Sequence, residues 1–165
     1  MMGHHREGPF ADAVGDLEYP MFVVTAAAGG RRAGCLVGFA AQCSISPPRF
    51  MVWLSHRNHT LGVAREAEGL GVHLLSSEDR ALAELFGSRC GEEVDKFGAV
   101  PWHEGPGGVP LLDDCPRWFV GRVLERFDSG DHDGFLLEPV EVGTGPWSGQ
   151  LGFQAVKDLE PGHDA

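Results

Sequence analysis

Glycine and proline divide this chain of 165 residues into short apolar runs. The sequence contains 24 glycines and 11 prolines, and no apolar run approaches the roughly 20 residues that span a bilayer as a helix. Because both residues interrupt helices, this pattern favours short strands and turns over long helices. A chain of this length fits one domain and can bury a core without disulfides or a structural metal. We therefore expect a single, mainly β domain.

Runs rich in β-branched and aromatic residues indicate strands. YPMFVVTAA (19–27) is the first, and GGRR (29–32) is typical of a hairpin turn after it. Later strand-like runs are AGCLVGFAAQCSIS (33–46), RFMVWLS (49–55), GVHLL (71–75), RWFVGRVLERFD (117–128) and GFLLEPVEV (134–142), with a last short strand in WSGQLGFQAV (147–156). Pro139 cannot donate to a sheet ladder, so it indicates an edge or a bulge.

Apolar residues at helical spacing predict two helices. The first helix is predicted within residues 59–70, with Thr60 as its cap and Gly69 at its end. The second is predicted behind a Ser77 cap. Its apolar face comprises Ala81, Leu82, Leu85 and Phe86.

Residues 92–116 are rich in Gly, Pro and Asp and predict a long loop, and such loops are often functional. Short strands, few helices and no regular β-α-β alternation predict an antiparallel β-barrel or sandwich with helical decorations. The predicted organisation is a flexible segment at 1–17, one domain at 18–156 and a tail at 157–165.

Charge and motifs exclude several classes of function. A net charge of −11 and a pI near 5.0 argue against nucleic acid or an anionic membrane as a partner, because both need a basic surface. The start MMGHHREGPF lacks the apolar core of a signal peptide, so we expect a cytoplasmic protein. No P-loop, dinucleotide fingerprint, G-x-S-x-G or H-E-x-x-H motif is present.

The four cysteines give no sign of a metal site or a redox pair. They lack Cys-x-x-Cys spacing and a histidine at zinc-finger distance, so we expect free thiols and no metal. Cys35 and Cys43 have no neighbour in sequence that would lower the pKa of a thiol. We interpret both as small core residues.

Four motifs occur in an order that resembles a known family. They are GCLVGFAAQCSISPPRFMVWLSHRNHT (34–60), DKF (95–97), GVPLL (108–112) and GDH (130–132). Together they resemble the flavin reductase family with the FMN-binding split-barrel fold, over roughly residues 18–145. The resemblance implies a mainly β, antiparallel Greek-key barrel that forms a homodimer. It also implies flavin near the subunit interface and hydride transfer from NADH or NADPH to that flavin.

The first motif is predicted to line the flavin, because its glycines allow the backbone to approach a flat ring. The residues concerned are Gly34, Cys35, Leu36, Val37, Gly38, Phe39, Gln42, Cys43 and Ser44. Many family members carry Thr and Asn where this chain has Leu36 and Gly38, so backbone contacts would have to hold the ring. It stays open whether flavin is a bound cofactor or a diffusing substrate, and the run is also compatible with a core strand containing glycine bulges.

The flavin phosphate is predicted to bind at the junction between the strand at 49–55 and the following helix, where N–H groups favour an anion. The residues are Ser55, Arg57, Asn58, His59 and Thr60, and Arg57 supplies the positive charge. A simple helix cap is the alternative. Lys96 beside Phe97 would cover the flavin or meet the phosphates of the pyridine nucleotide, the alternative being a solvated loop lysine.

His132 is typical of a hairpin turn when considered alone, since Asp and Gly flank it. The resemblance implies a position near the reactive face of the flavin, where this histidine helps to hold the nicotinamide. Asp131 would orient the turn or the ring. We predict an NAD(P)H-dependent reductase of FMN, or of FAD, that supplies reduced flavin to a partner monooxygenase. The alternatives are an FMN-binding electron-transfer or sensing protein without efficient NAD(P)H turnover, and a barrel without flavin.

Overall fold

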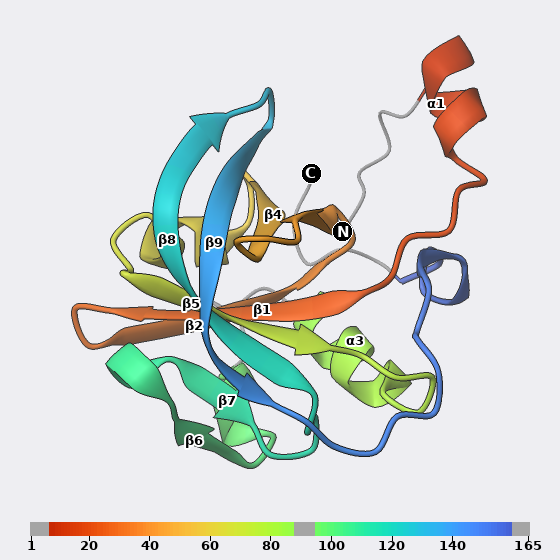
Figure 1. The fold of residues 1–165 in the computed structure, drawn as a ribbon. Helices are drawn as coiled ribbons and strands as arrows, with labels where there is room; N and C mark the ends of the chain where they lie inside the picture. Colours follow the sequence, from red (N-terminus) through yellow and green to blue (C-terminus); the bar gives the residue numbers. More distant parts are fainter. Residues whose placement is uncertain (1–6, 88–94, 160–165) are drawn as a thin grey trace.

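The computed structural model describes residues 7–87 and 95–159. Seven strands form one antiparallel sheet in the order β2-β1-β5-β8-β9-β4-β3, and a short hairpin of β6 and β7 lies beside it (Figure 1). Their bounds are β1 Phe22–Ala28, β2 Arg31–Val37, β3 Ala40–Ser44, β4 Arg49–Ser55, β5 Gly69–Leu74, β6 Trp102–Glu104, β7 Pro110–Leu112, β8 Trp118–Asp128 and β9 His132–Gly143. The predicted mainly β, antiparallel class with few helices is confirmed.

The turn between β1 and β2 is the predicted glycine hairpin. Ala28 pairs with Arg31, and the two intervening glycines, Gly29 and Gly30, have φ angles of 58° and 78°. Positive φ at both central positions matches the twist of a two-residue hairpin and is most easily adopted by glycine. The register of the whole β1–β2 pair follows from this turn.

The strands at the two edges of the sheet, β2 and β3, are consecutive in the chain. Only Gly38 and Phe39 separate them, so the sheet curls until its edges approach each other at this link. The Phe39 carbonyl oxygen accepts a hydrogen bond from the Trp53 N–H at 2.9 Å, which joins the link to β4. The curl places Phe39 beside strands that are far from it in sequence.

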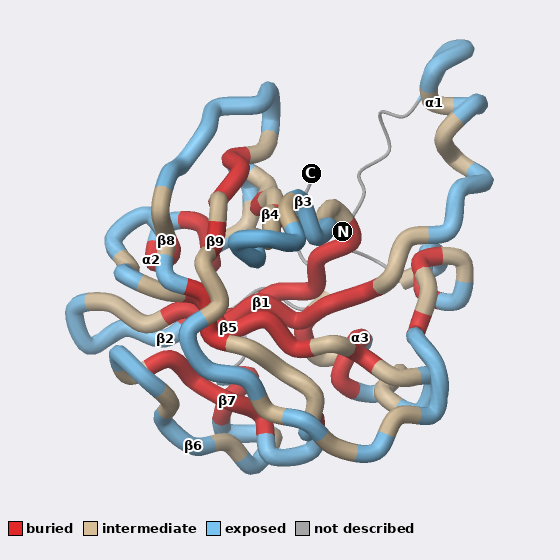
Figure 2. Tube along the Cα trace, in the orientation of Figure 1, coloured by how far each residue is buried: buried red, intermediate tan, exposed pale blue. Residues whose placement is uncertain are grey.

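The long β8–β9 hairpin carries the bulge predicted at Pro139. Gly121 pairs with Pro139 and Val120 with Glu141, so Val140 has no partner in the register. Proline cannot donate to the ladder, and a bulge accommodates that missing donor. Figure 2 shows the tip of this hairpin as exposed and the inner strands β1 and β5 as largely buried.

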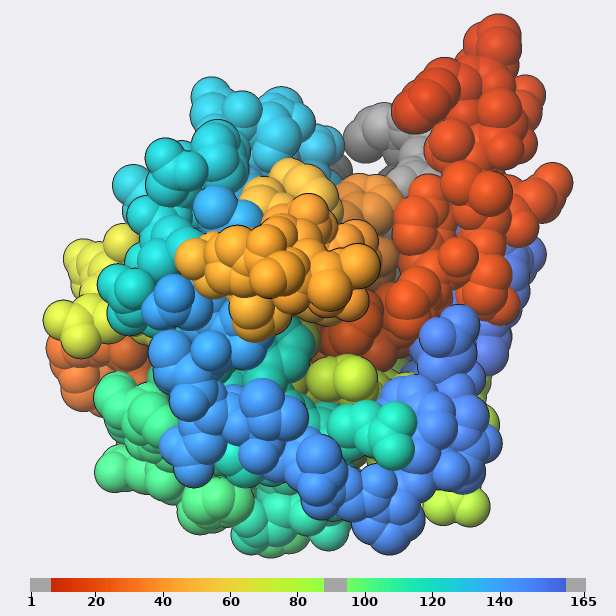
Figure 3. Space-filling model, viewed as in Figure 1, coloured from red at the N-terminus to blue at the C-terminus, as the bar shows by residue number. Residues whose placement is uncertain are grey.

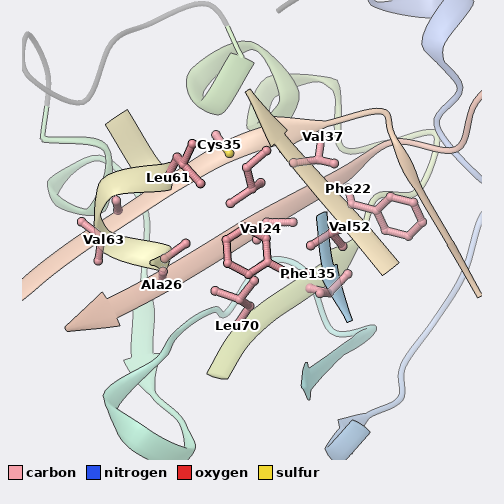
Figure 4. Packing of buried hydrophobic residues seen from close by; sticks show 14 of the residues in the cluster. Phe22, Val24, Ala26, Cys35, Val37, Val52, Leu61, Val63, Leu70 and Phe135 are labelled. Carbon is pink, nitrogen blue, oxygen red and sulfur yellow. The ribbon is translucent and has the colours of Figure 1, made fainter. Parts of the chain in front are cut away.

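The main core lies between the inner faces of the curled sheet and the helix α2 (His59–Ala64). Val24, Val52, Leu61 and Phe135 are buried and point toward one another (Figure 4). A second core packs the helix α3 (Arg80–Gly87) against β2 and the C-terminal segment, through residues such as Phe86 and Phe153. Alternate residues of a strand face opposite sides, so β2 contributes to both cores.

The predicted helix ends need correction. Asn58, and not Thr60, caps α2, because the Asn58 side chain accepts from the Thr60 N–H. The helix ends at Ala64, and Gly69 begins β5. Ser77 does not cap α3, since its hydroxyl group donates to the Ser148 carbonyl oxygen. On α3 the buried residues are Leu82, Ala83 and Phe86, whereas Ala81 is exposed.

The predicted long loop and the predicted last strand are both wrong. Residues 95–116 are not an irregular loop: the 3-10 helices η1 (Lys96–Gly98) and η2 (Pro106–Gly108) accompany the β6–β7 hairpin. The predicted strand at 147–156 forms only isolated bridges and the 3-10 helix η3 (Phe153–Ala155). Within the predicted N-terminal segment, α1 (Pro9–Val14) forms but buries none of its residues.

The outer surface beside the hairpin is formed by consecutive strands of the sheet. Figure 3 shows β3 in orange beside β8 and β9 in cyan and blue, and the sheet order places β4 between β3 and β9. Among the described residues, no helix combines the length and the apolar character that crossing a bilayer requires.

Candidate functional site

The link after β2, the end of β4 and the start of β9 meet at one place, which we call the His132 edge (Phe39, Ser55, Asp131 and His132). Ser55 pairs with His132 across the sheet, and the N–H of the next residue, His56, donates to the Asp131 carbonyl oxygen at 2.8 Å. The rings of Phe39 and His132 lie 5.1 Å apart, centroid to centroid. Four residues predicted from two separate motifs, 34–60 and 130–132, therefore come together.

The His132 ring is held from two sides. Its Nδ1 lies 2.7 Å from the Asp131 carboxylate, and Phe39 packs against the ring. The hydrogen bond with His132 lowers the pKa of Asp131, against the opposing effect of burial. With Nδ1–H donating to that carboxylate, Nε2 of the neutral ring is an acceptor. In the part of the chain that the structure describes, Nε2 has no hydrogen-bond partner, and the side chain is 20% exposed.

A second group of side chains beside the His132 edge was not found from the sequence. The buried carboxylate of Asp133 contacts His56 Nε2 at 2.8 Å and accepts from Nε and a terminal nitrogen of Arg65 at 3.1 Å each. Burial raises the pKa of Asp133, but the hydrogen bonds from His56 and Arg65 outweigh burial and keep the pKa below its ordinary value. The only signal in the sequence is that Asp133 follows the GDH motif and His56 follows Ser55.

The predicted phosphate site is only partly available. Asn58 and Ser55 already form hydrogen bonds with the local backbone. The Asn58 side chain accepts a hydrogen bond from the Thr60 N–H, and the Ser55 hydroxyl accepts one from the Arg57 N–H. Thr60 is buried, and its side chain forms a hydrogen bond with Cys35 inside the protein. His59 and Arg57 are exposed, and within residues 7–87 and 95–159 the Arg57 guanidinium forms no ion pair.

The predicted flavin-lining segment is mostly internal. Gly34, Cys35, Leu36, Val37 and Gly38 are buried. A Cβ atom added to Gly34 would lie 2.8 Å from the Phe86 ring, so the ring that this glycine approaches is one of the protein's own. Side chains reach the surface only from Phe39 onward.

The two cysteines of this segment differ in burial. Burial raises the pKa of Cys35 to about 11, and its interpretation as a core residue is confirmed. Cys43 is exposed on β3, so the same interpretation is wrong for Cys43. Nearby, Ser44 is half-buried and its carbonyl oxygen accepts from the exposed Gln42 amide at 3.1 Å.

Lys96 and Phe97 do not belong to the His132 edge. Both side chains are buried in the second core, so the alternative of a solvated lysine is wrong. Lys96 Nζ donates to the carbonyl oxygens of Phe86 and Gly34, at 3.1 and 3.3 Å. A cation at the C-terminal end of α3 satisfies carbonyl groups that have no partner within the helix. Lys96 thereby ties α3 to β2.

Known proteins resemble this chain over most of its length. NADH:riboflavin 5'-phosphate oxidoreductase of Streptomyces pristinaespiralis is 33% identical over 139 residues, which cover 82% of this chain and 77% of that protein. The reductase component of 4-hydroxyphenylacetate 3-monooxygenase of Pseudomonas aeruginosa is 30% identical over 141 residues, which cover 83% and 81%.

A solved structure supports the same relationship. An FMN-binding protein of Thermus thermophilus superposes with a TM-score of 0.74 at 28% identity, covering 86% of this chain and 81% of that one. The model of the flavin reductase like domain matches residues 14–154. That match includes every strand and the whole His132 edge, so this chain belongs to the flavin reductase-like domain family.

Proposed function

We propose that this protein is an NAD(P)H-dependent flavin reductase that transfers a hydride from NADH or NADPH to FMN or FAD. The observation that carries the proposal is the His132 edge, where Phe39, Ser55 and the Asp131–His132 pair meet in a chain of this family. The relatives named above are a flavin oxidoreductase and a monooxygenase reductase component.

In this proposal His132 positions the nicotinamide. Asp131 holds Nδ1–H, so Nε2 accepts an N–H from the nicotinamide carboxamide. A bound flavin supplies the atom N5 that accepts the hydride. Hydride transfer needs no protein base and depends on close and aligned reactants, so a fixed ring is the main contribution of this edge. Phe39 restrains the imidazole and contributes apolar surface.

The residues present fit a flavin with one adjustment to the sequence prediction. Since the side chains of residues 34–37 are buried, the flavin would contact this segment through backbone groups only. Arg57 offers an exposed cation for the phosphate, with His59 beside it, whereas Thr60 is turned inward. Gln42 and Ser44 would meet the ribityl chain. We propose no flavin contact for Lys96 or Phe97.

We further propose that residues 18–156 form a split-barrel domain that assembles as a homodimer. The support is an outer apolar patch (Ala41, Met51, Trp53, Phe127 and Leu136), which lies on the face of β3, β4, β9 and β8 opposite the core. Met51 pairs with both Ala41 and Leu136, while Gly134 pairs with both Trp53 and Phe127. Ala41 and Phe127 are exposed, and Met51, Trp53 and Leu136 are half-buried. A contiguous apolar patch that reaches the surface is typical of an interface.

Replacing Leu136 with lysine is expected to convert the dimer into a monomer. A charge in an apolar interface related by two-fold symmetry is introduced twice, and we expect the dimer dissociation constant to rise at least about 100-fold. Sedimentation velocity measures the change. Val140→Lys is the control, because Val140 is an exposed apolar residue of the same strand outside the patch. A dimer of undiminished strength in the Leu136 variant contradicts the proposed interface.

The proposed activity is tested by the absorbance spectrum of the protein with FMN, before and after anaerobic NADH. We expect the flavin band to bleach at catalytic protein concentrations, whether or not flavin remains bound through gel filtration. Tightly held flavin that stays oxidised would favour the alternative, an FMN-binding electron carrier or sensor. A protein whose melting temperature is unchanged by FMN and which leaves NADH intact has no flavin site, because a ligand of the native state raises stability.

We propose a partner monooxygenase as the consumer of the reduced flavin. One relative is the reductase component of such an enzyme, and this chain aligns with 81% of its length. We also propose that the protein acts in the cytoplasm, where NADH and NADPH are available.

A further inference from the structure

The Asp133 carboxylate links three segments, and the activity proposed above gives it no role. We call Asp133, His56 and Arg65 the Asp133 clamp. Asp133 lies near the start of β9, His56 follows β4 and Arg65 follows α2. The buried Asp133 carboxylate contacts both partner side chains at 2.8 to 3.1 Å. Removing the buried carboxylate would leave the partly exposed His56 and Arg65 side chains without their shared partner.

The clamp connects to His132 through the backbone and not through direct contact. Adjacent residues of a strand point to opposite faces, so the side chains of Asp133 and His132 diverge. The His56 side chain is held by Asp133, while its backbone N–H donates to the carbonyl oxygen of Asp131. Asp131 in turn holds the His132 ring. Three hydrogen bonds thus lead from the buried carboxylate to the imidazole.

The hydrogen bonds around Asp133 support a fixed and ionised carboxylate. The Arg65 guanidinium faces one carboxylate oxygen of Asp133 and the His56 imidazole faces the other. Arg65 is held further by the neighbouring strand, because Arg126 on β8 donates to its carbonyl oxygen at 3.1 Å. A carboxylate satisfied on both oxygens by two separate segments restrains the distance between those segments.

We propose that Asp133 is a positioning residue of this reductase: through His56 it fixes the Asp131–His132 turn against Phe39 and so sets the place of the nicotinamide. The inference rests on the proposed function. It extends the site beyond the residues that touch substrate, to a buried carboxylate whose charge is required although it never meets the reactants.

The test compares Asp133→Asn and His56→Gln with the control Glu125→Gln, which removes an exposed carboxylate from the same hairpin. Asn keeps the shape of Asp133 but cannot accept from His56 and Arg65 as an anion. His56→Gln removes the imidazole at a more exposed position and serves if the first variant folds poorly. We expect kcat/KM for NADH to fall about tenfold in both variants, mainly through KM, with the Kd for FMN nearly unchanged.

A readout without turnover separates this inference from the proposed function. The His132 ring lies against Phe39, so its NMR resonances carry the ring-current shift of Phe39, and a His132→Gln variant assigns them. We expect the ring-current shift of these resonances to decrease in both clamp variants and to stay unchanged in Glu125→Gln. Unmoved His132 resonances overturn the inference even if the parent is active. Moved resonances with kcat/KM within about twofold of the parent also overturn the positioning role. If the parent does not oxidise NADH with flavin, the proposed function fails, and with it the role of the clamp in NADH binding.

Discussion

Replacing His132 with alanine is expected to lower kcat/KM for NADH about 100-fold while the Kd for FMN changes less than about twofold. The imidazole is held by the Asp131 carboxylate and the Phe39 ring, and its Nε2 has no partner among the described residues. If this nitrogen positions the nicotinamide, its loss affects alignment for hydride transfer and leaves contacts with flavin in place. Steady-state NADH oxidation and a fluorescence titration with FMN measure the two quantities.

The chain provides a matched control for this substitution. His103 on β6 also pairs with a carboxylate, Asp113, at 2.6 Å, and it is exposed outside the His132 edge. His103→Ala removes a comparable histidine–aspartate contact and is expected to leave kcat/KM within about twofold of the parent. Equal losses in the two variants, or none in His132→Ala, would remove His132 from the proposed mechanism.

Lowering the pH from 6.5 toward 4 is expected to cost the folded state about 3 kcal/mol through one residue, His73. His73 is fully buried, its Nδ1 lies 3.0 Å from the Val23 carbonyl oxygen, and its Nε2 accepts from the Leu112 N–H at 3.0 Å. Burial lowers the pKa of His73 to about 4, although the hydrogen bond to Val23 opposes the shift. His73 of the unfolded chain is therefore protonated below about pH 6.5, whereas His73 of the folded chain stays neutral until about pH 4. Between these two pH values the free energy of unfolding decreases as the pH falls.

Urea unfolding at several values between pH 7.5 and pH 4.5 measures this effect, with His73→Gln as the comparison. The variant is expected to be less stable at pH 7.5, because buried groups of Val23 and Leu112 lose a partner, but to show a shallower decline with acid. Asp131, Asp133 and Glu138 have lowered pKa values, so the stability they contribute is lost only as the pH falls through still more acidic values. Parallel pH profiles for parent and variant would show that His73 is not the source.

Local patterns predicted the strands well, because alternation, β-branched residues and glycine turns act over a few residues. RFMVWLS became β4 over the predicted residues, Gly29 and Gly30 formed the predicted hairpin turn, and Pro139 lies at the predicted bulge. The β6–β7 hairpin was missed because its strands have three residues each, separated by a Gly- and Pro-rich turn. In such short strands, composition gives little signal, and pairing decides the structure.

The burial of individual residues was predicted less well than the strands. Thr60 was predicted as a helix cap and a solvated position was one alternative for Lys96, yet both residues are buried. Cys43 was interpreted as a core residue, yet it is exposed on β3. Burial depends on which distant segments pack over a residue. Motif order does not specify that packing, since core contacts join residues far apart in sequence.

The amino-acid sequence by itself determined the family, the mainly antiparallel β class and the glycine hairpin turn between β1 and β2. Only the tertiary structure decided that Phe39 contacts His132 and that Asp133 holds His56 and Arg65. The physical reason is sequence separation. Local conformation depends on neighbours within a few residues, whereas Asp133 meets partners 77 and 68 residues away, and that contact arises only when the sheet curls and pairs β4 with β9.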